Sequence, residues 1–187
     1  MTPLPLSPSH RQRGVALLIA LLILVVVSLM GITAMKTSMF SAKIATGTQV
    51  DAMAFEGAES AISDAYRHLE TMSSDDLQFF LGGGIMRRCL SGGTSTDSAC
   101  TASSRMDSRG LVNAGSRIRQ KGFQAVSGGQ VSMSGNSVIP MDFNFDIVGE
   151  SEVETFNIDN AHVQQALKRG LVSNSDLMSS ALQGSEQ

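Results

Sequence analysis

The side chains most able to do chemistry in this chain of 187 residues are its two cysteines, Cys89 and Cys100. The residues between them are rich in glycine, serine and threonine, so this segment is flexible enough to close a loop. In an oxidising compartment, a disulfide across such a loop adds roughly 3 kcal/mol to the free energy of unfolding by the chain-entropy estimate. A zinc site is the alternative, but no second cysteine pair or neighbouring histidine completes one. The spacing therefore predicts a structural disulfide.

A second pattern places oxygen-bearing side chains at alternate positions, in Asp142, Asn144 and Asp146. A calcium loop begins in this way. However, Ile147 stands where the turn glycine belongs, and Val153 stands where the bidentate glutamate belongs. We therefore interpret the segment as a strand and expect no metal and no other cofactor.

Catalytic motifs are missing from the sequence. It has no Gly-x-Ser-x-Gly elbow, no phosphate-binding loop ending in Gly-Lys-Ser/Thr and no His-Glu-x-x-His. The three histidines, His10, His68 and His162, are scattered along the chain. We predict that the protein is not an enzyme.

Charge is unevenly distributed, although the formal net charge is only −3. The segment 87–121 is strongly basic, and the segment 142–187 is strongly acidic. The basic segment could contact DNA, an acidic partner subunit or the acidic part of its own chain. Binders of single-stranded DNA interleave aromatic side chains for base stacking, and the only aromatic near this segment is Phe123. We favour self-complementarity or subunit docking, and consider nucleic acid unlikely.

An apolar N-terminal segment determines the compartment of these groups. Residues 15–35 are uncharged and span about 31 Å as a helix at ~1.5 Å per residue, close to the ~30 Å hydrocarbon core of a bilayer. Arg11 and Arg13 precede the run without any acidic residue, so we expect a cytoplasmic N-terminus. The run is too long for a secretory signal, and Ile32-Thr33-Ala34 matches the cleavage pattern poorly. A plain uncleaved anchor would look the same over this run.

Periodicity beyond the span predicts an α+β fold. A stripe at spacings of three and four residues predicts one buried helix face, formed by Phe55, Ala58, Ile62, Ala65, Leu69 and Met72. Residues 81–115 are rich in glycine and serine and are predicted to form a loop region. Strands are predicted at 122–126, 130–133 and 141–148, where Phe143, Phe145 and Ile147 alternate with polar residues. Residues 161–172 fit either a strand or a helix. We expect a long N-terminal helix packed against a small antiparallel sheet.

Three blocks in the first 70 residues carry a family resemblance. They are Arg13-Gly14-Val15-Ala16-Leu17-Leu18-Ile19-Ala20-Leu21, Leu29-Met30-Gly31-Ile32-Thr33-Ala34-Met35 and Ala54-Phe55-Glu56-Gly57-Ala58-Glu59-Ser60-Ala61. These blocks resemble the PilX-type minor pilins of Gram-negative type IV pilus systems. The last contains that family's helical motif, at Ala54, Phe55, Glu56, Ala58 and Glu59. Beyond Met72 the resemblance is loose.

The resemblance implies a pilin-like chain that is processed before assembly. The prepilin peptidase would cleave after Gly14, and Val15 would be N-methylated. The implied organisation is a leader at 1–14, a transmembrane and filament-core helix at 15–35, a periplasmic continuation of that helix at 36–73, and a globular domain with the disulfide loop at 74–187.

One position departs from the pattern of major pilins. These carry a glutamate at the fifth mature position, which here is Ile19. A carboxylate within a membrane is costly, and its presence usually has a functional reason. Its absence indicates a cap or initiator of the filament, unless Ile19 reflects neutral drift in a minor subunit.

The function implied is that of a structural minor pilin that primes or caps pilus assembly and so supports twitching motility, adhesion or DNA uptake. The partners implied are other minor pilins, the major pilin, a pilus tip adhesin, the inner-membrane assembly platform and the prepilin peptidase. The protein would cross the inner membrane once and then reach the filament or its tip. The alternatives are a tip pseudopilin of a type II secretion system and a membrane-anchored periplasmic binding protein unrelated to filaments.

Overall fold

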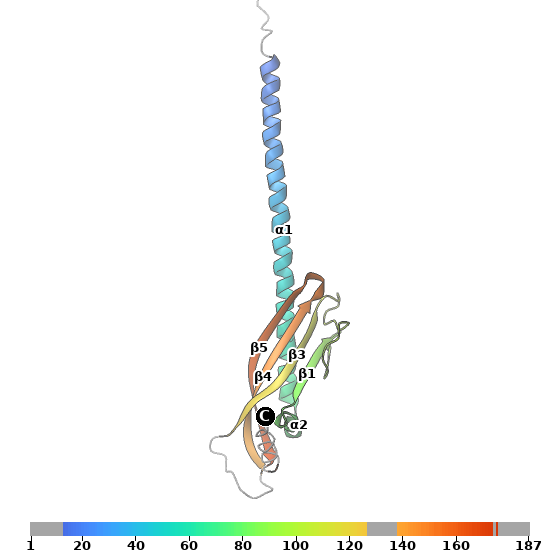
Figure 1. Cartoon of the computed structure of the whole chain (residues 1–187), viewed down its shortest axis with the longest axis vertical. Coiled ribbons are helices and arrows are strands. Elements are labelled where there is room, and N and C mark those ends of the chain that lie inside the picture. The colour runs from blue at the N-terminus through green and yellow to red at the C-terminus, as the bar shows by residue number, and fades with distance from the viewer. Residues whose placement is uncertain (1–12, 127–137, 174, 176–187) are drawn as a thin grey trace, which may run out of the picture. The chain divides into compact units, whose positions relative to one another are not determined.

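The structure is a computed structural model that describes residues 13–126, 138–173 and 175. The chain divides into two compact units, residues 1–48 and residues 49–187. The described part of the first unit is entirely helical and belongs to α1, which runs from Arg13 to Thr71 (Figure 1). Every described side chain of the first unit from Gly14 onward is exposed. No core therefore exists among the described residues of this unit.

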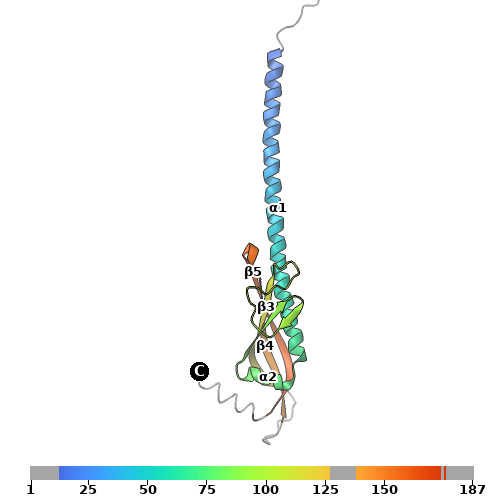
Figure 2. The same cartoon turned by 90° about the vertical axis from the view of Figure 1, so that its right-hand side faces the viewer.

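The second unit contains one antiparallel sheet with helices on one side (Figures 1 and 2). The strands lie in the order β2-β1-β3-β4-β5, so both long hairpin strands β4 and β5 are at one end of the sheet. The elements that follow α1 are α2 (Ser74–Leu81), β1 (Ile85–Ser91), β2 (Thr94–Thr96), β3 (Asn113–Ala125), β4 (Val138–Val153), η1 (Glu154–Phe156) and β5 (Ile158–Ser173).

The core lies between the inner face of the sheet and the two helices. Its largest buried side chains are aromatic: Phe80 of α2 contacts Phe145 of β4 edge-on, with ring centroids 5.0 Å apart. The alternation predicted for 141–148 is confirmed, because Phe143, Phe145 and Ile147 are all fully buried. β4 is a strand throughout this segment, as the interpretation of the Asp142–Asp146 pattern requires.

The face that α1 turns to the sheet is made mostly of small residues. Its buried members in the second unit are Val50, Ala54, Gly57, Ala58, Ala61, Ile62, Ala65 and Leu69. The predicted stripe is correct from Ala58 onward and wrong at Phe55, which is 48% exposed. The buried face passes through Ala54 instead, because only a small side chain fits where the helix backbone approaches the strands.

The predicted loop region 81–115 is wrong where it contains β1, β2 and the start of β3, and correct between β2 and β3. Within this region, Gly92 and Gly93 form the tight turn that joins β1 to β2, with φ of 56° and 79°, values that glycine adopts without strain. Residues 161–172, which fit two interpretations, are part of strand β5. Residues 122–125 lie in β3, whereas the predicted strand at 130–133 lies outside the described residues.

Helix α2 begins with a capping signal in the sequence Ser73-Ser74-Asp75-Asp76, where the periodic pattern of α1 stops. Ser73 accepts a hydrogen bond from the backbone N–H of Asp76, and the Asp76 carboxylate accepts one from the backbone N–H of Ser73. This reciprocal capping box satisfies two helix N–H groups that would otherwise lack partners. The same four residues therefore end the α1 pattern and begin α2.

Substitution of Gly149 tests how closely α1 and β4 approach. A Cβ atom at Gly149 would lie 2.4 Å from the carbonyl oxygen of Ala58 and 2.6 Å from Cγ1 of Ile62. We expect Gly149→Ala to lower the free energy of unfolding by about 1–3 kcal/mol, because backbone must move to make room. Urea unfolding of the full-length protein in detergent measures this change. The control is Gly122→Ala, where nothing lies within 4 Å of the added methyl group. Equal stability of the two variants would contradict the tight contact.

Candidate functional site

The apolar surface of the first unit is the largest feature of the molecule that needs an environment other than water. α1 contains a stretch with a mean hydropathy of 3.2, long enough to cross a membrane, and none of that stretch is buried. Val15 is 61% exposed and Ile19 52% exposed, so both are on the free surface of the helix. An exposed apolar surface of this kind is stable only when lipid or other protein covers it.

The residues predicted for processing lie at the start of this helix. Gly14 is in its first turn, and a Cβ atom added there would meet nothing within 4 Å. The first acidic residue after the start of α1 is Asp51, so no carboxylate accompanies Ile19 on the apolar surface. Gly14, Val15 and Ile19 remain predictions as processing, methylation and docking positions.

The segment 54–59 that was interpreted as a family motif lies in the second unit, where its small residues contact the sheet. Ala54 and Ala58 are fully buried. A Cβ atom at Gly57 would lie 2.3 Å from Oγ of Ser151 on β4, so only glycine allows the observed approach. Sequence analysis gave Gly57 and Gly149 no role. A glycine within a long strand, such as Gly149, is a signal of close backbone approach that could have identified the contact.

Two motif residues face β5 rather than the core. Oε1 of Glu59 lies 2.6 Å from Nδ1 of His162, and the His162 ring meets the ring of Phe55 edge-on with centroids 4.3 Å apart. The Glu59 and Phe55 side chains therefore hold His162 of β5 against α1. Glu56, the remaining motif residue, is exposed.

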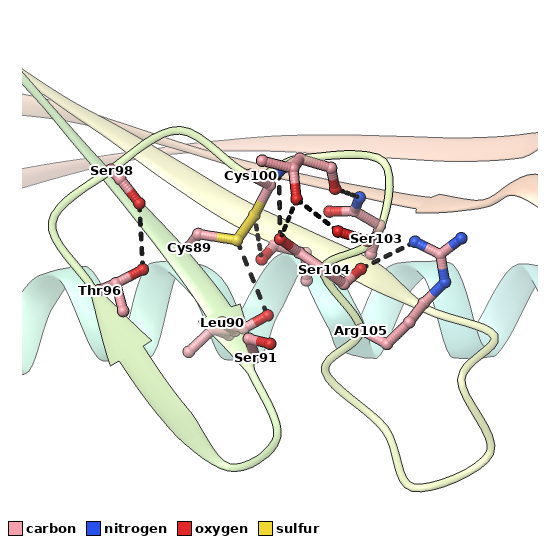
Figure 3. The surroundings of a disulfide bond; sticks show 12 residues. Cys89, Leu90, Ser91, Thr96, Ser98, Cys100, Ser103, Ser104 and Arg105 are labelled. Carbon is pink, nitrogen blue, oxygen red and sulfur yellow. Dashed lines mark hydrogen bonds between the residues drawn. A yellow bond between two sulfur atoms is a disulfide. The ribbon is translucent and has the colours of Figure 1, made fainter.

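Cys89 and Cys100 form a disulfide, with Cα atoms 4.9 Å apart (Figure 3). Cys89 is in β1 and Cys100 is in the segment that follows β2, so the bond ties that segment to the sheet. Gly115 of β3 lies directly opposite Cys89, and a Cβ atom there would be 3.0 Å from Sγ of Cys100. Gly115 thus leaves room for the disulfide on the sheet.

The segment after Cys100 is held by two further residues. Oδ1 of Asp107 accepts hydrogen bonds from the backbone N–H groups of Leu111 and Val112, each 2.8 Å long. Arg105 donates to the carbonyl oxygens of Ala102 and Gly110 and pairs with Glu154 at 2.9 Å. Burial raises the pKa of Asp107. Hydrogen bonds from the backbone N–H groups of Val112 and Leu111 lower this pKa by more than burial raises it, so the net pKa lies below the usual value. The segment is therefore fixed at its start, middle and end.

A buried arginine with two carboxylate partners lies next to Cys89 in β1 and was missed by sequence analysis. Arg88 of β1 is only 7% exposed, and its Nε donates to Asp64 of α1 at 2.8 Å. The same guanidinium also donates to Asp97 and to Oγ of Ser95. Ser95 and Asp97 lie within nine residues of Arg88, but Asp64 belongs to α1 and is 24 residues away, so no local pattern signals its contact with Arg88.

The basic segment pairs largely with the acidic strand region, as self-complementarity predicts. Arg117 pairs with Glu150, and Arg119 and Lys121 lie 3.8 Å and 3.6 Å from Asp146. Asp142, at the far end of β4, forms a two-point contact with Arg169 of β5 at 2.8 Å and 3.1 Å. Within the described ranges, no group of three or more histidine, cysteine, aspartate or glutamate side chains is placed to hold a metal ion.

Removal of the disulfide tests its contribution to stability. We expect the double variant Cys89→Ser, Cys100→Ser to lose roughly 3 kcal/mol of unfolding free energy, because the unfolded chain regains the freedom of the closed loop. Thermal unfolding measures the loss. A reductant should lower the melting temperature of the wild type and leave the double variant unchanged; a wild type indifferent to reductant would contradict the prediction.

Acidification tests the Asp142–Arg169 contact. Hydrogen bonds from Arg169, together with its charge, hold the pKa of Asp142 below its usual value. The stability gained from this lowered pKa is present above the unfolded-state pKa of about 3.9 and is lost as the pH falls below it. We expect Asp142→Asn to be less stable than the wild type at pH 6 and to lose less stability between pH 5 and pH 2. Urea unfolding at each pH measures the difference, and parallel curves would contradict it.

Comparison with known proteins identifies the N-terminal segment. Residues 13–63 match a protein family described as PilX N-terminal. No curated protein and no solved structure matches the chain. The matched residues include the exposed apolar helix and the motif that contacts the sheet, and together with that helix they fit a membrane-anchored pilin. The chain thus carries a PilX N-terminal domain over residues 13–63, consistent with a PilX-type minor pilin.

Proposed function

We propose that this protein is a structural minor pilin that primes or caps assembly of a type IV pilus. The observation that carries the proposal is a PilX N-terminal match over residues 13–63 that includes an apolar helix exposed throughout residues 14–49. Such a helix can reside first in lipid and then among the helices of other subunits, because both environments cover apolar surface equally well. The proposed role includes no catalytic step.

The proposed route begins at the inner membrane. The leader 1–14 lies in the cytoplasm, residues 15–35 cross the bilayer, residues 36–73 continue the helix into the periplasm, and residues 74–187 form the periplasmic domain. Arg13 next to the span supports this orientation. The prepilin peptidase removes the leader after Gly14, Val15 is methylated, and the subunit then enters the filament or its tip.

Ile19 supports a position at the end of the filament rather than along it. The carboxylate that major pilins carry at this position is thought to pair with the N-terminal amine of a neighbouring subunit. An isoleucine that is 52% exposed offers only apolar contact. The subunit would therefore dock with other minor pilins, the major pilin, a tip adhesin and the assembly platform in a way that does not repeat.

Two alternative functions differ in what the described residues support. Tip pseudopilins of type II secretion systems usually carry a large inserted helical domain, whereas the helices between residues 72 and 173 are only α2 and η1 in the described part of the chain. A membrane-anchored periplasmic binding protein would keep its leader and would stay in the membrane when surface filaments are sheared from cells. Pilus-dependent twitching, adhesion and DNA uptake are the activities that a minor pilin would support.

The N-terminal mass of the full-length protein tests the proposal. In cells with prepilin peptidase we expect a chain that begins at methylated Val15, and in cells without the peptidase we expect the leader to remain. Gly14→Val should block cleavage, because the bond after Gly14 is the proposed cut. Gly31→Val is the matched control within the same helix, since neither glycine has a neighbour within 4 Å. An uncleaved wild-type chain in cells with active peptidase would contradict the proposal.

A further inference from the structure

Strand β5 is a long edge strand without the usual protection against pairing. It pairs residue for residue with β4, from Ile158 opposite Val153 to Ser173 opposite Val138, with no bulge. It contains no proline, and no strand pairs with its outer edge among the residues that the structure describes. Proteins usually shorten, bulge or charge such an edge, because its free backbone groups recruit other strands.

The register identifies which backbone groups are free. The N–H of Leu171 points away from β4 and donates to Oγ of Ser74 in α2. In an antiparallel pair, alternate residues direct both backbone groups to the same side. Ala161, Val163, Gln165, Leu167 and Arg169 therefore direct their N–H and C=O groups to the outer edge.

The side chains at this edge attract rather than repel another chain. Val163 is 65% exposed, and Leu167 and Leu171 are each 56% exposed. The charged side chains of the same stretch are already engaged within the molecule: Arg169 pairs with Asp142, and the Nζ atom of Lys168 donates to the carbonyl oxygen of Glu70 at 2.7 Å. An approaching strand therefore meets apolar surface, an arginine paired with Asp142 and a lysine turned toward a backbone carbonyl of α1.

Two cavities follow the edge on its α1 side. The first, of about 320 Å³, is lined by Glu59, Ile62, Ser63, Tyr66 and Gln164. The second, of about 230 Å³, is lined by Tyr66, Leu69, Glu70, Leu167, Lys168 and Arg169. Tyr66, the single tyrosine of the chain, belongs to both and is 44% exposed. A strand laid beside β5 would place alternate side chains over these cavities and against Tyr66.

We propose that the free edge of β5 between residues 161 and 169 binds an extended strand from a different subunit of the same pilus. This inference rests on the proposed function. Only an extended polypeptide matches alternating N–H and C=O groups along a strand, and side chains on one of its faces would occupy the cavities. A second copy of this chain fits less well, because antiparallel pairing of two β5 strands would point the two α1 segments 49–71 in opposite directions. Subunits of one helical filament are related head to tail and share a direction.

Amide hydrogen exchange of the full-length protein tests the inference. The protein is measured alone in detergent and in a complex purified from membranes with the major and other minor pilins. We expect the amides of Val163, Gln165 and Leu167 to slow by about tenfold or more in the complex, because strand addition protects free amides. The amides of Gln164 and Ala166, which face β4, should be slow in both samples.

Two variants test the edge independently of exchange rates. Gln165→Pro removes an outward N–H without removing a hydrogen bond to β4, and Gln165→Ala is the matched control that keeps the N–H. Val163→Lys places a charge on the edge and covers the case in which the proline variant does not fold. We expect at least about tenfold less complex to be recovered with Gln165→Pro or Val163→Lys than with the wild type, at an unchanged melting temperature, because a proline or a charge on an edge strand blocks pairing. Gln165→Ala should behave as wild type.

The outcomes separate this inference from the proposed function. A complex in which the amides of Val163, Gln165 and Leu167 exchange as fast as in the free protein would overturn the β5 inference alone. Slow exchange of these amides in the free protein, equal slowing at even and odd positions, or the same alternation in a complex of this chain alone would also overturn it. Failure of the wild type to purify with any pilin would overturn the proposed function, and the β5 inference with it.

Discussion

The second unit is organised around the close approach of a helix backbone to a sheet. The backbones of Ala58 in α1 and Gly149 in β4 meet without intervening side chains, and Gly57 leaves room for the side chain of Ser151. This contact fixes the distance between helix and sheet, which then determines how much space remains for side chains elsewhere. Farther along α1 the gap is filled by Ile62 and Leu69, and beyond α1 by the aromatic groups of β4 and α2. The small residues at 54–58 are thus mainly a packing surface, and Glu59 extends the contact to β5 through His162.

The first unit, in contrast, has no internal packing contact of this kind among its described residues. Its described residues bury nothing of their own, and their apolar surface is covered only when the protein is in lipid or in an assembly. The second unit is therefore stabilised by its own core, whereas the first unit is stabilised by the lipid or protein around it. Polar residues of the second unit balance one another within the chain, since the basic side chains of β3 lie against the acidic side chains of β4.

The sequence predicted those features that follow from local pattern. The apolar span, the buried alternation in β4 and the cysteine pair can each be recognised within a short segment. The family resemblance adds the motif at 54–59, although not the reason for its small residues. The features that were missed depend on residues distant in sequence. The sequence of β1 resembles a loop because it contains charged Arg88, whose burial depends on ion pairs with Asp64 and Asp97. Phe55 resembles a core residue in the sequence, and only the structure shows that it contacts His162 at the surface.

The segment from Cys100 to Val112 has a consequence for how this surface can change during evolution. Its conformation depends on the disulfide, on Asp107 and on Arg105, and these residues bind mainly backbone groups of the segment. Thr101, Ala102, Ser103, Ser108 and Arg109 are exposed between these fixed points. Their side chains can be exchanged without disturbing β1 or the core. The segment is therefore a place where related subunits can diverge in what they present to the outside while the fold beneath stays constant.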